Sequence, residues 1–312
     1  MSAFGIAASH TPLKDFKDPA PGVRETVDAC FARLRAEVAA FAPTLVLAFG
    51  PDHFNGFFYR LMPSFCIGAV AESVGDWATP AGPLPGNPAL AEAAVAFAQA
   101  AGVDLAISHR MEVDHGHTQL LHLLFDWATM PPVLPVFVNC VGTPRPPLAR
   151  VAALGRALGA FVGGLDERVL VLGSGGISHD PPVPALNGAP PEVRERLIAG
   201  GGLSAEARAA RQARVVDEAN RQVAGTGTGV PLNPVWDRKF LAALEQQDFA
   251  ALTACSDEEI SRDGGRGGHE IRCWIAAAAA MQALAAPAPR VLLYHTIPEW
   301  VAGFAVASQG PV

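Results

Sequence analysis

Short apolar runs recur along the chain and alternate with longer segments in which apolar residues are spaced three and four apart. The short runs are continuous rather than alternating, which is typical of strands covered on both faces. In the longer segments Val27, Phe31, Leu34 and Val38 follow the spacing of one helix face. Strands alternating with helices predict an α/β fold, a layered sheet flanked by helices. The expected strands span residues 4–8, 44–49, 133–138, 169–172 and 291–294, and the expected helices span 21–41, 147–162, 205–223, 239–246 and 271–284.

Residues at the ends of these segments indicate where helices and loops begin. Asn87 followed by Pro88 is typical of a helix N-cap and first helical position, so we expect a helix to begin there. Residues 79–88 are rich in proline and glycine, and residues 263–268 read Asp-Gly-Gly-Arg-Gly-Gly. Both stretches are predicted to be loops, the second of them directly before a helix.

Composition narrows the function classes. The chain has 312 residues, of which 50% are hydrophobic, and no segment resembles a linker, so we expect a single catalytic domain over residues 1–312. The formal net charge is −7 and no run of basic residues occurs, so we do not expect the protein to bind nucleic acid.

Targeting signals and cysteines point to the cytoplasm. The first lysine is Lys14, so the start of the chain lacks the basic region of a secretory signal. The most apolar stretch, residues 274–286, is shorter than the roughly 20 residues that cross a membrane. Five widely spaced cysteines form no C-x-x-C pair, which speaks against disulfides and structural zinc. We therefore expect a reduced, cytoplasmic protein that is not bound to a membrane.

Histidines in turn-rich segments are the candidate chemistry. His10, His53 and His179 each follow a predicted strand, and His115 lies in Val113-Asp114-His115-Gly116-His117. In an open α/β sheet the loops at the carboxyl ends of neighbouring strands converge on one crevice. We therefore expect an active site in these loops, built to bind a metal or to move protons.

Glu270 is a candidate carboxylate for that site because it follows the glycine-rich loop and begins a predicted helix. Ferrous oxygenases often hold iron with two histidines and one carboxylate on one face, which leaves positions open. No His-x-Asp or His-x-Glu occurs, so such a triad must be assembled from distant loops. Fe²⁺ with two neutral imidazoles and one carboxylate carries a net charge of +1, which favours an anionic bidentate ligand such as a catecholate.

The chain resembles the extradiol dioxygenases of the protocatechuate 4,5-dioxygenase superfamily, and within it the enzymes that cleave 3-(2,3-dihydroxyphenyl)propionate. The resemblance runs essentially from end to end. The segments that carry it are residues 9–13, 48–58, 113–116, 133–137, 172–184, 232–237, 269–271 and 297–304.

The resemblance implies specific roles. It implies that His10, His53 and Glu270 ligate Fe²⁺, that His179 is the proton acceptor and that His115 is the proton donor. It further implies O₂-dependent extradiol cleavage of 3-(2,3-dihydroxyphenyl)propionate, and of its 2,3-dihydroxycinnamate analogue, to a 2-hydroxy-6-oxonona-diene-dioate-type product. Relatives lead us to expect a homo-oligomer, a tetramer. His117 lies outside the family's pattern.

Several alternatives stay open at the level of sequence. Asp114 could orient His115 or serve as a turn residue, and Asn55 could contact the substrate or form a turn. A zinc-dependent hydrolase using His115 and His117 is the alternative function. The substrate carboxylate needs a cationic or N–H partner, for which Arg60, Arg110 and Arg266 are unranked candidates.

Overall fold

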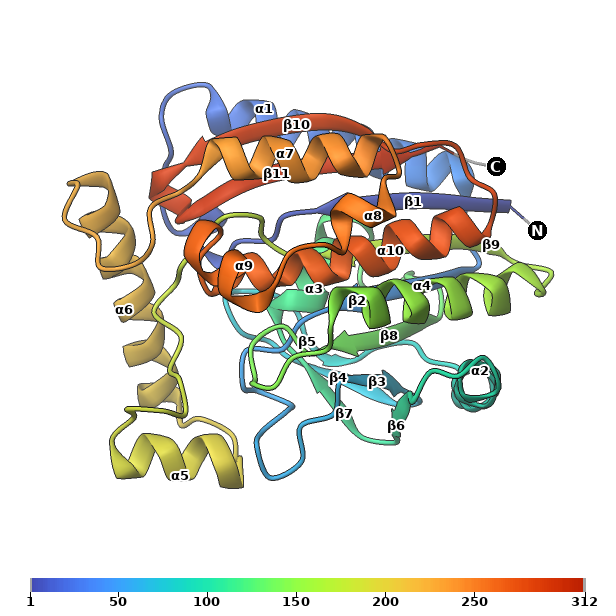
Figure 1. The fold of residues 1–312 in the computed structure, drawn as a ribbon, viewed down its shortest axis with the longest axis horizontal. Coiled ribbons are helices and arrows are strands. Elements are labelled where there is room, and N and C mark those ends of the chain that lie inside the picture. The colour runs from blue at the N-terminus through green and yellow to red at the C-terminus, as the bar shows by residue number, and fades with distance from the viewer. Residues whose placement is uncertain (1, 311–312) are drawn as a thin grey trace.

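The computed structural model describes residues 2–310, and an eight-stranded mixed sheet runs through its centre (Figure 1). The strand order is β10-β11-β1-β9-β2-β8-β3-β6. The four strands from β1 to β8 in this order are parallel, whereas β11 pairs antiparallel with both β1 and β10. The bounds are β1 (Ser2–Ala8), β2 (Leu45–Gly50), β3 (Phe65–Gly68), β6 (Ala106–Ser108), β8 (Val133–Val138), β9 (Arg168–Ser174), β10 (Arg290–Ile297) and β11 (Ala302–Gln309).

The predicted layered α/β fold is confirmed, with one difference at the sheet edge. All five expected strands are present, and the strand predicted over residues 133–138 has the bounds of β8. The run at residues 291–294 was expected to be covered on both faces, but it lies in β10, an edge strand with mostly half-buried side chains. Its partner β11 was not predicted, because its alanine- and glycine-rich sequence lacks a strong strand pattern.

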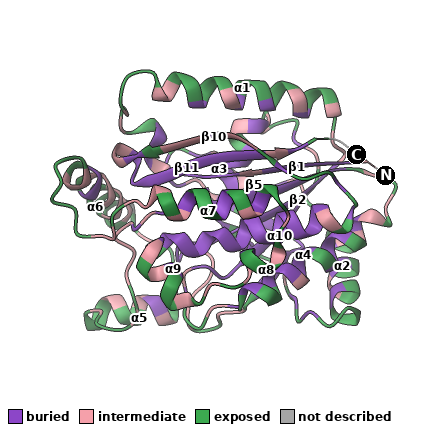
Figure 2. Ribbon diagram, turned by 45° about the horizontal axis from the view of Figure 1, so that its top comes forward, coloured by how far each residue is buried: buried purple, intermediate pink, exposed green. Residues whose placement is uncertain are grey.

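Helices cover both faces of the sheet. On one face lie α2 (Pro88–Ala100), α4 (Leu148–Gly163) and α10 (Ile271–Ala283), and on the other lie α1 (Val23–Phe41) and α3 (His115–Leu124). Figure 2 shows α10 buried along almost its whole length. A Cβ added at Gly155 of α4 would lie 2.2 Å from the Ala276 oxygen, so only glycine permits α4 to approach α10 this closely. The predicted N-cap is confirmed, since Asn87 Oδ1 accepts from the Leu90 N–H.

A second, three-stranded sheet adjoins the first, in the order β5-β4-β7. It consists of β4 (Ala71–Val74), β5 (Ala81–Pro83) and β7 (Met111–Val113), and β5 lies inside the stretch predicted to be a loop. Because β4 and β7 are parallel, with Ser73 opposite Val113, the residues that follow these two strands emerge side by side. This arrangement brings Asp76 to the start of α3.

The remaining helices differ in where they lie: two stand beyond the carboxyl ends of the parallel strands, and three lead into α10. Helices α5 (Pro191–Ala199) and α6 (Ala205–Val223) stand at the end of the molecule toward which β1 runs (Figure 1). Helices α7 (Pro234–Glu245), α8 (Phe249–Leu252) and α9 (Asp257–Asp263) lead into α10. Within residues 2–310, none of the helices combines the length and the apolar character needed to cross a membrane.

Candidate active site

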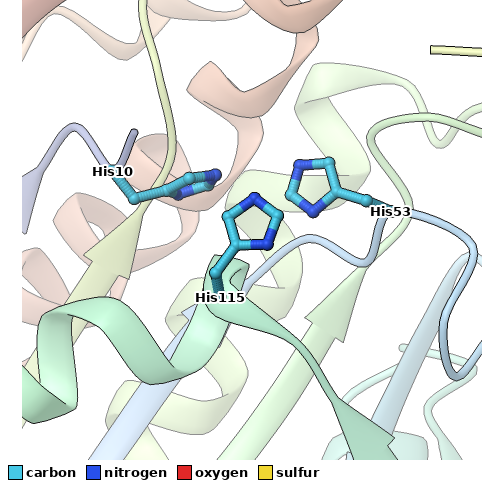
Figure 3. A group of neighbouring side chains, drawn as sticks. All are labelled: His10, His53 and His115. Atoms are coloured by element: carbon cyan, nitrogen blue, oxygen red, sulfur yellow. The ribbon is translucent and has the colours of Figure 1, made fainter. Parts of the chain in front are cut away.

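The sheet topology brings three of the predicted histidines together. Strands β1, β9 and β2 are adjacent and parallel, and His10, His179 and His53 follow their carboxyl ends. His115 arrives from β7 as the first residue of α3, and Glu270 ends the short 3₁₀ helix Gly267–Glu270 that precedes α10. Figure 3 shows the rings of His10, His53 and His115 turned toward one another. The five residues predicted from sequence therefore lie in one place.

Glu270 is the centre of this group. Its Oε1 lies 3.2 Å from His53 Nε2, and its Oε2 lies 3.5 Å from His10 Nε2 and 3.5 Å from His179 Nε2. The Gly176 N–H donates to Oε2 at 2.6 Å and holds the carboxylate in place. His10, His53, His115 and Glu270 are all buried. A buried carboxylate is costly unless a positive charge compensates it, and a cation shared with the three imidazoles would do so.

The donor set fits a divalent metal ion. Two ligands at right angles and about 2.1 Å from an ion lie about 3 Å apart, close to the separations of Glu270 from His10 and His53. His10, His53 and His115 also place one nitrogen each within 4.8 Å of one another, so His115 borders the same space. His10, His53 and His179 lie at similar distances from the Glu270 carboxylate, so the choice of His10, His53 and Glu270 as the ligand set rests on the family resemblance.

Burial tunes the charges of the donors. Burial lowers the pKa of His10 to about 3, against the opposing effect of Glu270, so its imidazole is neutral and free to bind a metal. Burial alone would raise the pKa of Glu270, but His10 and His179 hold it well below its usual range. A neutral nitrogen from His10 and an ionised oxygen from Glu270 are thus available. Burial alone would lower the pKa of His53, but Asp114 and Glu270 hold it well above its usual range.

Each metal-facing histidine is oriented through its second nitrogen. His53 Nδ1 lies 3.1 Å from Asp114 Oδ2, which also accepts from the His53 backbone N–H and from Asn55 Nδ2. His10 Nδ1 lies 3.1 Å from Ser174 Oγ. Such partners fix the ring orientation and leave Nε2 for the metal. Asp114 therefore orients His53, not His115, and Asn55 supports Asp114.

Asp76 is the partner of His115, and sequence reasoning missed it. Its Oδ2 accepts from His115 Nδ1 at 2.6 Å, and its Oδ1 accepts from the His115 backbone N–H at 2.8 Å. Both side chains are buried. Asp76 follows Gly75 in an otherwise ordinary loop, and only the pairing of β4 with β7 shows that it reaches His115.

Two glycines enclose the ring of His179. A Cβ added at Gly267 would lie 2.2 Å from His179 Nε2, and one added at Gly176 would lie 2.3 Å from His179 Cε1. His179 Nδ1 lies 3.1 Å from the Ile177 oxygen. Since a carbonyl can only accept, Nδ1 carries a proton. Nε2 faces Glu270 Oε2 at 3.5 Å, and this carboxylate raises the pKa of His179 against the effect of burial. The glycine-rich loops thus serve to seat His179.

A cavity opens beside the histidines. His10, His53, His115 and His179 all line it, together with Arg211 and mostly apolar side chains. The other lining residues are Thr11, Pro12, Leu13, Trp77, Pro181, Pro182, Val183, Val215, Trp300, Val301 and Ala302. A small number of polar groups thus lines a largely apolar pocket, as in sites for small molecules.

His117 has a different environment. Its Nε2 lies 3.3 Å from the Val136 oxygen, and a Cβ at Gly50 would lie 2.8 Å from its ring. Among residues 2–310, the groups of side chains that lie close enough to hold a metal are His10, His53 and His115, and Asp76, Asp114 and His115; neither includes His117 or Glu270. The arrangement does not support a zinc site made by His115 and His117.

Comparison with known proteins identifies the family. Residues 5–305 match the family model of the catalytic LigB subunit of aromatic ring-opening dioxygenase. A protein of Cupriavidus pinatubonensis named 2,3-dihydroxyphenylpropionate/2,3-dihydroxicinnamic acid 1,2-dioxygenase is 49% identical over 303 residues, 97% of this chain and 96% of the relative. Relatives with the same name from Escherichia coli K12 and Rhodococcus jostii are 46% and 45% identical, and each alignment covers at least 96% of both chains.

A solved structure supports the fold. An uncharacterized protein of Escherichia coli K12 is similar with a TM-score of 0.56 at 14% sequence identity, covering 98% of this chain and 99% of that one. With the family match over residues 5–305 and relatives near half identity over almost the whole length, the chain belongs to the catalytic LigB family of aromatic ring-opening dioxygenases.

Proposed function

We propose that this chain is a ferrous-ion-dependent extradiol dioxygenase that cleaves 3-(2,3-dihydroxyphenyl)propionate, and the 2,3-dihydroxycinnamate analogue, with O₂. The relatives' names support the substrate. The observation that carries the reaction type is the convergence of His10, His53 and Glu270 on one point, with two further histidines beside them. A site that only bound a metal would need three of these five side chains, so the other two are available to move protons.

The metal would lie between His10, His53 and Glu270. When bound there, a ferrous ion supplies a site that holds both catechol oxygens and O₂ side by side and passes electrons from the ring to oxygen. Two neutral imidazoles and one carboxylate leave a charge of +1, which suits a catecholate. His53, held by Asp114, and His10, beside Ser174, are oriented before any ion arrives.

The two other histidines differ in their partners, and this difference supports different roles. His179 has the neutral Ile177 oxygen at Nδ1 and the Glu270 carboxylate at 3.5 Å from Nε2. With a metal ion bound to Glu270, Nε2 would be the atom that accepts a proton from the catechol hydroxyl. His115 has the Asp76 carboxylate at Nδ1, 2.6 Å away, which orients the ring and supports its role as the proton donor. Acceptor and donor line the same cavity, so one bound ring can reach both.

The product follows from the bond that is cleaved. Cleavage beside the two hydroxyls, with both oxygen atoms of O₂ retained, gives a ring-opened 2-hydroxy-6-oxonona-diene-dioate-type acid.

We further propose one catalytic domain over residues 1–312, a homotetramer as the working form and the cytoplasm as its location. The five cysteines, which are all free, support a reducing compartment.

Anaerobic loading with Fe²⁺, followed by O₂ and a panel of 3-substituted catechols, tests the proposal. We expect one O₂ consumed per catechol and a yellow ring-cleavage product, and we expect Glu270→Gln to lose both bound iron and O₂ uptake. Turnover under nitrogen with zinc would instead indicate a hydrolase and would overturn the proposal.

A further inference from the structure

Arg211 of α6 is the one lysine or arginine among the described residues that line the histidine cavity, and no aspartate or glutamate lines it. The Arg211 Nη2 donates to the backbone oxygen of His53 at 2.7 Å. Within residues 2–310, its guanidinium forms no ion pair with a carboxylate. Arg211 is half-buried and borders both this cavity and a second one that is lined by Glu192 and Arg214, with most of its donors uncommitted.

The other candidates for an acid-binding group are either occupied or remote. Arg60 and Arg110 are exposed and do not line the cavity. Arg266 lines a neighbouring cavity, where it is paired with Asp180, and Arg145 of that cavity is paired with Asp257.

That neighbouring cavity touches His53 and Glu270 but neither His115 nor His179. A catechol placed between the proton acceptor and the proton donor must therefore lie in the cavity that contains Arg211.

The wall between the histidines and Arg211 is suited to a short carbon chain. Val215 lies one helical turn beyond Arg211 on α6, and both residues line the cavity. Pro181, Pro182 and Val183 also line it. A side chain on the catechol ring would contact these apolar groups and the guanidinium within the same cavity.

We propose that Arg211 binds the carboxylate of the substrate's side chain and thereby sets the preference for catechols that carry an acid. The inference rests on the proposed function, since it takes the catechol ring to lie between His115 and His179. An arginine can hold a carboxylate through two parallel N–H···O bonds, and the partly buried position strengthens them. Arg211 acts on binding and not on ring cleavage itself.

The test compares an acidic with a neutral substrate in the Fe²⁺-loaded full-length enzyme. For Arg211→Gln we expect the KM for 3-(2,3-dihydroxyphenyl)propionate to rise about 10- to 100-fold, the effect of losing a hydrogen bond to a charged group. We expect kcat for that acid, and both constants for 3-propylcatechol, to stay within about threefold. Anaerobic binding of each catechol should show the same split without turnover.

Arg214→Gln is the matched control. Arg214 lies three residues further along α6, is exposed, and does not line the histidine cavity, yet its loss changes the net charge equally. It should leave both substrates within about threefold of wild type. Equal losses for both substrates in Arg211→Gln would show that Arg211 only supports His53, and a loss of acid preference in Arg214→Gln would show a diffuse charge effect; either result overturns the proposal.

Two further outcomes separate this inference from the proposed function. Should Arg211→Gln fail to fold, wild type decides: its KM for the acid must be at least about tenfold below that for 3-propylcatechol, and equal values overturn the role of Arg211. If wild type consumes O₂ with neither catechol, the proposed ring cleavage fails and this inference with it. If both are cleaved and Arg211→Gln leaves their ratio unchanged, only the role of Arg211 is refuted.

Discussion

Replacing Asp76 by asparagine tests whether His115 is a proton donor held in place by a carboxylate. The substitution keeps the size of the side chain, and an amide oxygen can still accept from the His115 backbone N–H, which now donates to Oδ1 at 2.8 Å. It removes the negative charge that lies 2.6 Å from His115 Nδ1 in a buried pair. With the amide oxygen on that N–H, the amide NH2 faces His115 Nδ1, so the change removes both the negative charge beside the ring and the acceptor that keeps a proton on Nδ1.

The size of the effect follows from that contact. A hydrogen bond to a charged group contributes about 1.5–3 kcal/mol, which corresponds to roughly a 10- to 150-fold loss in kcat if it is needed only when His115 is protonated. Loss of a carboxylate behind a working histidine in a metal site typically costs a similar factor. Bound iron should stay unchanged, because Asp76 contacts neither His10, His53 nor Glu270 in the described chain.

A double-mutant cycle with His115→Gln provides the assay. O₂ uptake gives kcat for the two single variants and the double variant, metal analysis gives iron content, and thermal unfolding confirms that each variant is folded. If Asp76 acts through His115, Asp76→Asn should lower kcat by less than about twofold when His115 is already glutamine. An equal loss in both backgrounds would refute the reasoning, since Asp76 would then act elsewhere.

Three further predictions concern the metal, the seat of His179 and the effect of acid. His53→Ala should lose iron, whereas His179→Ala should keep iron and lose most turnover; full iron occupancy in His53→Ala would contradict the ligand assignment. In Gly267→Ala the new methyl group would meet His179 Nε2 at 2.2 Å, so kcat should fall about 100-fold with iron retained, and near-normal turnover would show that the ring need not sit there. Burial lowers the pKa of His117 to about 4, below the 6.5 of an unfolded chain, so its contribution to stability is complete above pH 6.5 and declines as the pH falls toward 4. Between pH 6.5 and 5, the free energy of unfolding of wild type should therefore fall by about 2 kcal/mol more than that of His117→Gln, as measured by urea titration. Parallel curves of unfolding free energy against pH for variant and wild type would contradict this.

The local pattern of the chain determined the elements and the candidate site residues. Continuous apolar runs predicted the central strands because such strands are covered on both faces, and Asn87 with Pro88 marked the start of α2. Histidines placed just after those runs were expected to converge, since parallel strands share one carboxyl edge. Glu270 was a candidate because it follows the glycine-rich loop and begins a predicted helix, whereas the roles of the five residues rested on the family resemblance. The structure brings all five together.

Tertiary structure alone decided the contacts that orient those residues. Asp76 reaches His115, 39 positions away, because β4 and β7 pair in parallel, and Asp114 turns to His53 because it also caps α3. Arg211 meets the His53 carbonyl from 158 positions away because α6 lies across the carboxyl edge of the sheet. No periodicity in the chain encodes such pairings, since they depend on how whole elements pack and not on the residues next to each group.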